Sequence, residues 1–482
     1  MLTEEEIKTF MERDSSSNRK KMAKVGQRYY DAEHDIMDYR MFYYNADGQL
    51  VEDTYRTNTK MSHPFFTELV DQAVQYMLSG EDGIIHSDIP ELQSRLDEYF
   101  DDDFICELND VLTGTMSKGF EYMYVYMNKD GRLSFECADS LGVIEVRERD
   151  TDDGCAYVIY WYIDKLTREN KTIKRIQVWD KNETHFYVQE NNGKLMFDDS
   201  EPINPRPHVI YTKENDKHIY FDNFGFIPFF RLDNNKKQWS SLKPIKDLID
   251  DYDIMSCGLS NNLADFDYPI HVVKGFNGDD LNELQTNLKT KKVVGVDADG
   301  GLEVHTVDIP HEARKTKMDE DEKNIYRFGM GFNSAQVGDG NVTNVVIKSR
   351  YALLDLKCNK LEIRLKKFLK SIIKVVIDDI NRNDKTAYNV SDVWFDFDRE
   401  VMTNASDNAQ IELTDAQKRD VEINTIMSLN NVLDNETIIQ YICDVLDLDY
   451  DDIKDRLPKG EDEDIEDNKT AQTVLDGMTT DE

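Results

Sequence analysis

One long helix constrains the fold of this chain more than any other predicted element. From residue 347 to residue 372, apolar side chains recur at strictly alternating steps of four and three residues. Such spacing places them all on one side of a helix. We therefore predict a helix from Val345 to Asn381, roughly 55 Å long at about 1.5 Å per residue. Its buried seam consists of Ile347, Tyr351, Leu354, Cys358, Leu361, Leu365, Phe368 and Ile372.

The exposed side of this helix is predicted to be basic. Lys357, Lys360, Arg364 and Lys367 lie there, in a chain with 58 Lys and Arg against 96 Asp and Glu and a net charge of -38. A basic face in so acidic a chain favours contact with an acidic neighbour. Alternatively, this face is exposed to solvent and its basic residues form ion pairs within the helix. Contact with nucleic-acid phosphate is a further alternative, which we rank below contact with protein. The overall charge disfavours a conventional nucleic-acid-binding surface.

A second amphipathic helix is predicted over residues 240–265. Its apolar residues run from Leu242 to Leu263 at three- and four-residue steps, and we expect this stripe to be packed. Opposite it lie four carboxylates, which we expect to face water: Asp247, Asp250, Asp251 and Asp253.

A small unit follows, with a strand at Ile270–Lys274, a helix at Asp280–Leu288 and a hairpin turning at the DADGG of residues 297–301. Another charged helix returns from Glu312 to Phe332. The chain therefore places an α/β excursion between two helices. Upstream, helices are predicted over residues 3–44, 64–78, 90–100 and 101–118. Residues 122–197 read as short strands joined by turns.

Several of these segments resemble the portal proteins of tailed bacteriophages, in particular the long-tailed type. The similar stretches are IPFF at 227–230, the Asn-Asn turn at 234–235, LIDDYDIMSCGLSNNLADF at 248–266, PIHVVKG at 269–275 and HPFFTELVDQAVQYMLSG at 63–80. They occur in the order of that family, and the similarity extends from about Tyr29 to Asn381.

The resemblance implies an α+β, multidomain portal-type subunit with long stem helices, a small α/β clip, a β-rich wing and a helical crown. The implied divisions are a wing at 1–239 (helical, then β-rich), a stem helix at 240–265, the clip at 266–309, a stem helix at 310–332, a tunnel loop at 333–344, a long helix and return strand of the wing at 345–400, the crown at 401–460 and an acidic disordered tail at 461–482.

The function implied is that of a portal, or head-to-tail connector. Such a protein forms a ring of twelve subunits at one capsid vertex, through which the large terminase packages double-stranded DNA that is later ejected. Further implied partners are a head-completion adaptor and the major capsid and scaffolding proteins. The resemblance places the protein at the portal vertex of the virion, and in the host cytoplasm during assembly.

Three groups of site residues follow. Asp247, Asp250, Asp251 and Asp253 are expected to line the channel, and the basic residues from Lys357 to Lys367 are expected to contact the next subunit. The glycines and asparagines of the tunnel loop disfavour both helix and strand. An ordinary surface loop is the alternative interpretation of this segment. Its residues are Gln336, Val337, Gly338, Asp339, Gly340, Asn341, Val342 and Thr343.

Motifs for catalysis are missing from the sequence. It contains no GxxxxGK[ST], HExxH or GxSxG motif and no Cys-His zinc spacing, so we expect no catalytic residue, metal or cofactor. A Mg-dependent nucleic-acid-processing enzyme that uses the Asp clusters at 101–104 and 250–253 is the alternative. The six cysteines form no CxxC pair and are expected to be free thiols. We also expect no secretory or membrane-spanning segment.

Overall fold

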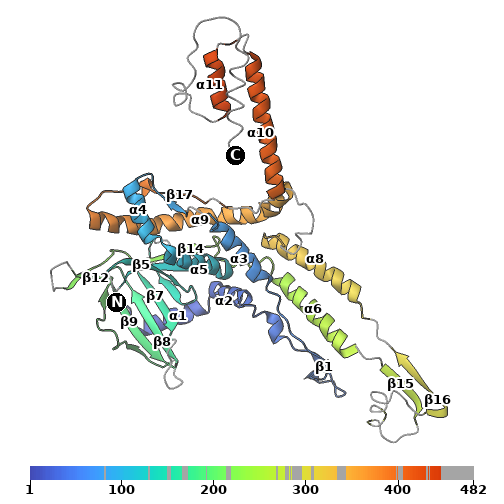
Figure 1. Ribbon diagram of the computed structural model, residues 1–482. Coiled ribbons are helices and arrows are strands. Elements are labelled where there is room, and N and C mark those ends of the chain that lie inside the picture. Colours follow the sequence, from blue (N-terminus) through green and yellow to red (C-terminus); the bar gives the residue numbers. More distant parts are fainter. Residues whose placement is uncertain are drawn as a thin grey trace. The chain divides into compact units, whose positions relative to one another are not determined.

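The computed structural model shows a mixed α and β chain (Figure 1). It describes residues 1–80, 83–128, 131–148, 154–164, 172–191, 193–212, 219–266, 270–276, 282, 284, 296–305, 309–333, 344–397, 399, 405–429, 433 and 435–446. The chain divides into two compact units, one of residues 1–339 with 348–401 and one of residues 340–347 with 402–482. The predicted mixture of helix and sheet is confirmed, and the finer division into named domains stays a prediction.

Helices dominate the first part of the larger unit. Thr3 caps the first helix by accepting the Glu6 amide, while the Glu6 carboxylate accepts the Thr3 amide in return, which satisfies two otherwise free donors. Asp101 caps another by accepting the Phe104 amide. These helices are α1 (Glu4–Ser15), α2 (Asn18–Tyr30), α3 (Phe65–Met77), α4 (Pro90–Tyr99) and α5 (Asp102–Lys118), with a short 3₁₀ turn η1 at Asp35–Asp38.

Antiparallel sheets follow, as predicted from the short strands joined by turns at residues 122–197. A six-stranded sheet has the order β10-β9-β8-β7-β6, with β11 also paired to β9, and a three-stranded sheet has the order β14-β4-β5. The strands are β4 (Phe120–Met127), β5 (Leu133–Ala138), β6 (Val143–Val146), β7 (Tyr157–Ile163), β8 (Ile173–Trp179), β9 (Glu183–Glu190), β10 (Leu195–Phe197), β11 (Arg206–Pro207) and β14 (Phe229–Asp233).

Four short strand pairs complete the β structure. The strands of each pair run antiparallel. The pairs are β1 with β2, β12 with β13, β3 with β17 and β15 with β16. Their bounds are β1 (Phe42–Tyr44), β2 (Leu50–Glu52), β3 (Ile85–His86), β12 (Val209–Thr212), β13 (Ile219–Asp222), β15 (Ile270–Phe276), β16 (Val296–His305) and β17 (Trp394–Phe395).

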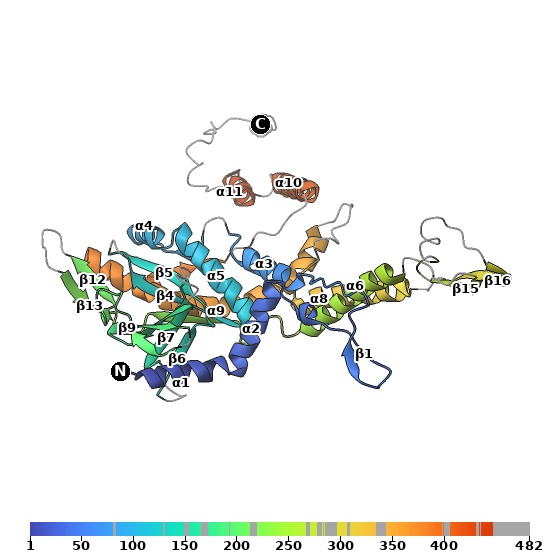
Figure 2. The same cartoon turned by 90° about the horizontal axis from the view of Figure 1, so that it is seen from below.

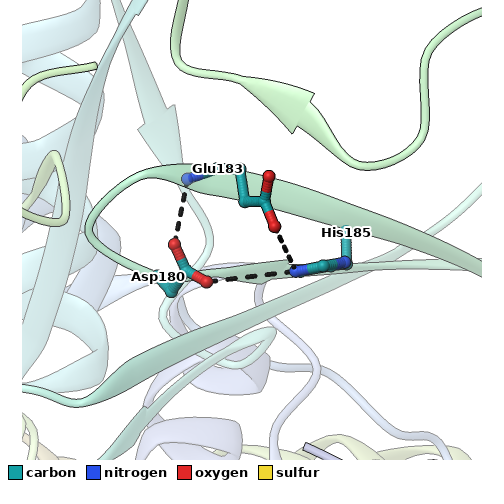
Figure 3. A group of neighbouring side chains, drawn as sticks. All are labelled: Asp180, Glu183 and His185. Carbon is teal, nitrogen blue, oxygen red and sulfur yellow. Dashed lines mark hydrogen bonds and ion pairs between the residues drawn. The ribbon is translucent and has the colours of Figure 1, made fainter. Parts of the chain in front are cut away.

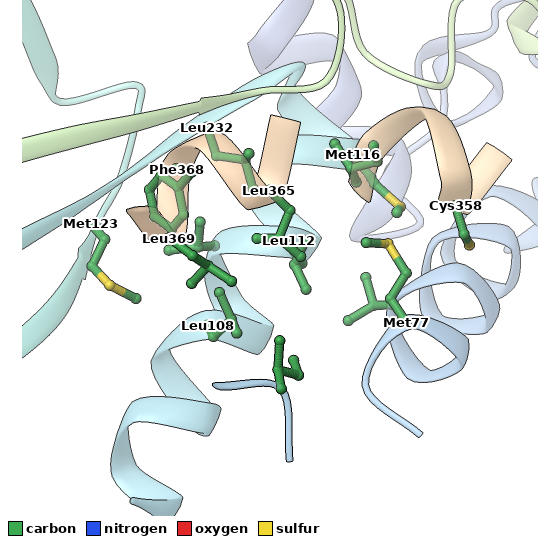
Figure 4. Close-up of a cluster of buried hydrophobic side chains, with 14 of the residues drawn as sticks. Met77, Leu108, Leu112, Met116, Met123, Leu232, Cys358, Leu365, Phe368 and Leu369 are labelled. Carbon is green, nitrogen blue, oxygen red and sulfur yellow. The ribbon is translucent and has the colours of Figure 1, made fainter. Parts of the chain in front are cut away.

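The long predicted helix is present as α9 (Asn344–Asp384), and its seam forms the main core. Leu354, Cys358, Leu361, Leu365, Phe368 and Ile372 are all buried, and Tyr351 is partly buried. Figure 4 shows how this face meets three other elements: Met77 comes from α3, Leu108, Leu112 and Met116 come from α5, and Leu232 comes from β14. Seam packing therefore joins α9 to helices and strands distant in sequence. The Ile347 side chain lies outside the described residues.

The predicted hairpin at residues 297–301 is wrong. These residues belong to β16, which pairs with β15 from Ile270 opposite His305 to Phe276 opposite Val296. A register shift between Lys274 and Phe276 accommodates the longer strand, as a β-bulge does. Because Gly301 pairs with Lys274 and Val296 with Phe276, residues 297–300 bulge within β16 instead of forming the turn of a hairpin. The helix predicted at Asp280–Leu288 falls largely outside the described residues.

The smaller unit contains α10 (Ala405–Ser428) and α11 (Asn435–Val445), which pack against each other. Ile423, Ile438 and Cys443 are its buried apolar residues among those described. Both elements are helical, as the resemblance implies for residues 401–460. The acidic tail at 461–482 lies outside the described residues. Within the part of the chain that is described, no helix has the length and apolar character needed to cross a bilayer.

Candidate functional site

Two helices, α6 (Lys246–Phe266) and α8 (His311–Gly329), pack along each other and flank the β15–β16 pair in sequence (Figures 1 and 2). Lys317 of α8 joins them, because its ammonium donates to Asp251 of α6 at 2.5 Å and also to Asp321 on its own helix. Ile249 and Ile325 are buried where the pair meets the main core. The two helices therefore form a rigid rod within one subunit.

Asp253 of α6 is fully buried, which corrects our expectation that it faces a channel. Its carboxylate accepts hydrogen bonds from Nδ1 of His34 at 2.6 Å, from Nδ1 of His63 at 2.7 Å and from the backbone amide of His63 at 3.1 Å. Burial alone would raise the pKa of Asp253, but the bonds from both histidines outweigh it and lower the pKa. The buried carboxylate thus fastens the segment around residues 34–63 to α6.

The other three carboxylates of α6 have different surroundings. Asp250 accepts the Tyr29 hydroxyl and pairs with Lys246 at 2.6 Å, while Asp251 pairs with Lys317. Each of these two carboxylates therefore has a cationic partner within the subunit, which it shares with a second carboxylate. Asp247 is exposed, and it makes no ion pair among the residues described. Of the four predicted channel residues, Asp247 is the one whose charge stays free for a channel.

The Asp clusters of the enzyme alternative do not form a metal-binding arrangement. Asp250 is paired with Lys246 of its own helix, and Asp251 is paired with Lys317 of α8. Asp101 caps α5, where it accepts the Phe104 amide at 3.1 Å, and Asp102 and Asp103 occupy the first turn of that helix. Carboxylates at a helix N-terminus are stabilised there by the helix dipole without any ion.

Lys357 is partly buried, and its ammonium is bound within the subunit rather than free on the predicted basic face. Its ammonium donates to the backbone carbonyls of Leu69 and Gly329, each at 3.2 Å. Burial lowers the pKa of Lys357 to about 8. Lys360 and Lys367 are exposed and Arg364 is partly buried, so these three residues keep the predicted basic face. The tunnel loop, Gln336–Thr343, lies outside the described residues.

Comparison with known proteins identifies the family. The family of phage portal proteins described as SPP1 Gp6-like matches residues 12–454. This chain belongs to that family. The portal protein of Bacillus phage SPP1 is 29% identical over 367 residues, covering 76% of this chain and 71% of that protein. The portal protein of Clostridium phage phiCD119 is 24% identical over 388 residues, covering 77% of this chain and 82% of that protein.

Solved structures give a weaker likeness. The neck of a native GTA particle, computed with C12 symmetry, has a TM-score of 0.38 at 12% identity and covers 79% of this chain and 89% of its own. The neck of an empty GTA particle, computed with C6 symmetry, has a TM-score of 0.41 at 13% identity, with 80% and 91% covered. Such scores are too low to support an argument about this chain.

Family membership confirms the function predicted from the sequence, that of a portal protein of tailed phages, and no comparison supports the enzyme alternative. The family is structural rather than enzymatic. Its members sit in the head-to-tail connector of the virion. The residues that the sequence did not single out are His34 and His63, whose contact with Asp253 spans 219 and 190 positions along the chain.

Proposed function

We propose that copies of this chain close into a dodecameric ring in which α9 contacts the neighbouring subunit. A second stripe on α9 supports this proposal. It runs along the side away from the buried seam and repeats at the same three- and four-residue steps. Its members are Leu353, Leu356, Lys360, Ile363, Lys367, Lys370 and Lys374, all of them exposed.

The composition of this stripe suits contact with protein. Leu353, Leu356 and Ile363 are 41%, 47% and 73% exposed. Full burial of one such side chain stabilises a contact by roughly 1.5–3 kcal/mol. The lysines of the same stripe add attraction toward an acidic surface, and the chain carries a net charge of -38. Heptad-spaced residues of this kind pack against a partner helix or groove. A ring closes when such a contact is repeated head to tail around an axis.

We infer further that the rods of α6 and α8 surround a channel for double-stranded DNA, with Asp247 among the residues facing it. Each tight phosphate contact adds a barrier to sliding, because released counterions must return when the contact breaks. An exposed carboxylate on an acidic subunit avoids such contacts. The large terminase, a head-completion adaptor, and the major capsid and scaffolding proteins are the proposed partners, and the host cytoplasm is the proposed place of assembly.

The α9 contact is tested with Ile363→Asp, analysed by sedimentation velocity of the purified protein. A buried, unpaired charge opposes association, so we expect the wild type to sediment as a large closed oligomer and the variant to sediment mainly as monomer. Ile363→Val serves as the matched control and should assemble like the wild type. An Ile363→Asp protein that forms full-sized oligomers would exclude this face from the subunit contact.

A further inference from the structure

Three potential metal ligands lie together at the tight turn between β8 and β9 (Figure 3). Asp180 and Glu183 bracket the turn, and His185 follows on β9. One ligand atom from each side chain lies within 4.8 Å of the other two. Among the residues described, this is the one group with such geometry. No sequence motif marks this group, and the portal function does not use it.

The spacing of these atoms fits ligands that share one cation better than it fits direct hydrogen bonds. Nε2 of His185 lies 3.4 Å from Oε1 of Glu183 and 3.9 Å from Oδ2 of Asp180. A direct N–H···O bond would have a length of about 2.7–3.2 Å. Two ligands at roughly 2.0–2.2 Å from one tetrahedral ion are about 3.4 Å apart. The pair of His185 and Glu183 already has that separation.

Asp180 is held in position by the backbone of the turn. Its Oδ1 accepts the amides of Asn182 at 2.8 Å and Glu183 at 2.9 Å, while the Asp180 amide donates to the Glu183 carbonyl at 3.1 Å. These bonds occupy one carboxylate oxygen and leave Oδ2 directed toward the imidazole (Figure 3). A carboxylate fixed in this way needs little further ordering when a cation binds.

The burial of the imidazole is a second observation beside this spacing. The His185 side chain is only 6% exposed and points Nε2 at the two carboxylates, at distances longer than a direct hydrogen bond. A buried nitrogen without a short hydrogen bond is costly, and coordination through Nε2 would give it a bond. Nδ1 of the same ring takes no part in the site.

We propose that Asp180, Glu183 and His185 bind a divalent first-row transition cation of the Zn²⁺ type, with water in the remaining position. One imidazole and two carboxylates match the ligand preferences of such ions. Because β11 pairs with β9 at Thr184 and Glu183, the cation would brace the six-stranded sheet where its central hairpin turns. Its role would be structural, since the site has no partner groups for a reaction among the residues described.

The test uses the purified full-length protein, stripped with a chelator and titrated calorimetrically with Zn²⁺; Co²⁺ then reports coordination through its visible absorption. We expect one ion per subunit, with affinity reduced at least tenfold by His185→Gln, Asp180→Asn or Glu183→Gln. Glu183 is half-exposed, so Glu183→Gln should leave the fold intact. We also expect Zn²⁺ to raise the melting temperature of the wild type more than that of Glu183→Gln.

His305→Gln provides the matched control. His305 lies 3.5 Å from Glu303 and resembles the candidate pair, but both side chains are more than half exposed and no second carboxylate is grouped with them. This variant should bind Zn²⁺ like the wild type. Zn²⁺ binding that survives all three substitutions, binding lost in His305→Gln, or the absence of stoichiometric binding by the wild type would each overturn the proposal.

Discussion

Asp253→Asn should weaken the attachment of the segment around residues 34–63 to α6 without unfolding the rest of the subunit. The ionised carboxylate accepts from Nδ1 of both His34 and His63. An asparagine side chain has one acceptor oxygen, so its amide group must face one of these N–H donors. His34 cannot easily adopt the other tautomer, because its buried Nε2 has no partner for a proton.

The size of this effect follows from the lost interaction. A buried donor left unsatisfied costs about 1–3 kcal/mol. The large oligomeric protein is not a two-state system, so the suitable readout is local opening measured by amide hydrogen exchange. A loss of about 2 kcal/mol corresponds to roughly 30-fold faster exchange when the amide exchanges by that opening. The informative amides are those of Met61 and His63, which bond to Cys257 Sγ and Asp253.

Asp247→Asn is the matched control, since it removes the same charge from an exposed position of the same helix. We expect wild-type exchange at Met61 and His63 in that variant. Unchanged exchange in Asp253→Asn would refute the reasoning, because the carboxylate would then not hold this segment. Equal acceleration in both variants would refute it as well, since the effect would follow from net charge alone.

Three further predictions follow from the core, a buried lysine and the loop. The pKa of Lys357 is lowered to about 8. Between that pH and about 10.5, the unfolded chain binds a proton that the folded chain has lost. The free energy of unfolding should therefore rise with pH, by at most about 1.4 kcal/mol per pH unit. The melting temperature should rise over this pH range in the wild type and in Lys360→Met, but not in Lys357→Met. A rise that persists in Lys357→Met would contradict the prediction. Phe368→Ala should weaken the core around α9 by about 3–5 kcal/mol, measured as faster amide exchange along that helix, whereas Asp378→Ala, at an exposed α9 position outside the contact stripe, should change exchange little; similar acceleration in both would argue against the seam. Deleting residues 336–343 should leave rings assembled but impair DNA packaging in vitro, and normal filling would reject a working role for the loop.

Local periodicity explains what could be predicted from the sequence. The α9 seam is a property of one continuous segment, and its spacing alone identifies the buried residues from Leu354 to Ile372. The strands between residues 122 and 197 were found from their aromatic and β-branched residues and the turn residues between them, which are also local signals. Each of these patterns needs only the geometry of its own element.

Contacts between distant segments explain what could not be predicted. Asp253 lies on the polar side of its helix, yet two histidines from the N-terminal region enclose it. Lys357 reaches carbonyls of Leu69 and Gly329, and the Gly301 region is held in a strand by pairing with Lys274. In each case the partner is at least 27 positions away, and no local pattern records it. Residue types alone therefore placed these groups in water or in a turn.

Electron microscopy of the purified protein in negative stain tests the ring most directly. If neighbouring subunits join through α9 and their rods of α6 and α8 surround a channel, class averages should show closed rings with a central hole wide enough for a DNA duplex. A population of compact monomers or dimers, with no perforated particle under conditions that favour assembly, would contradict this account.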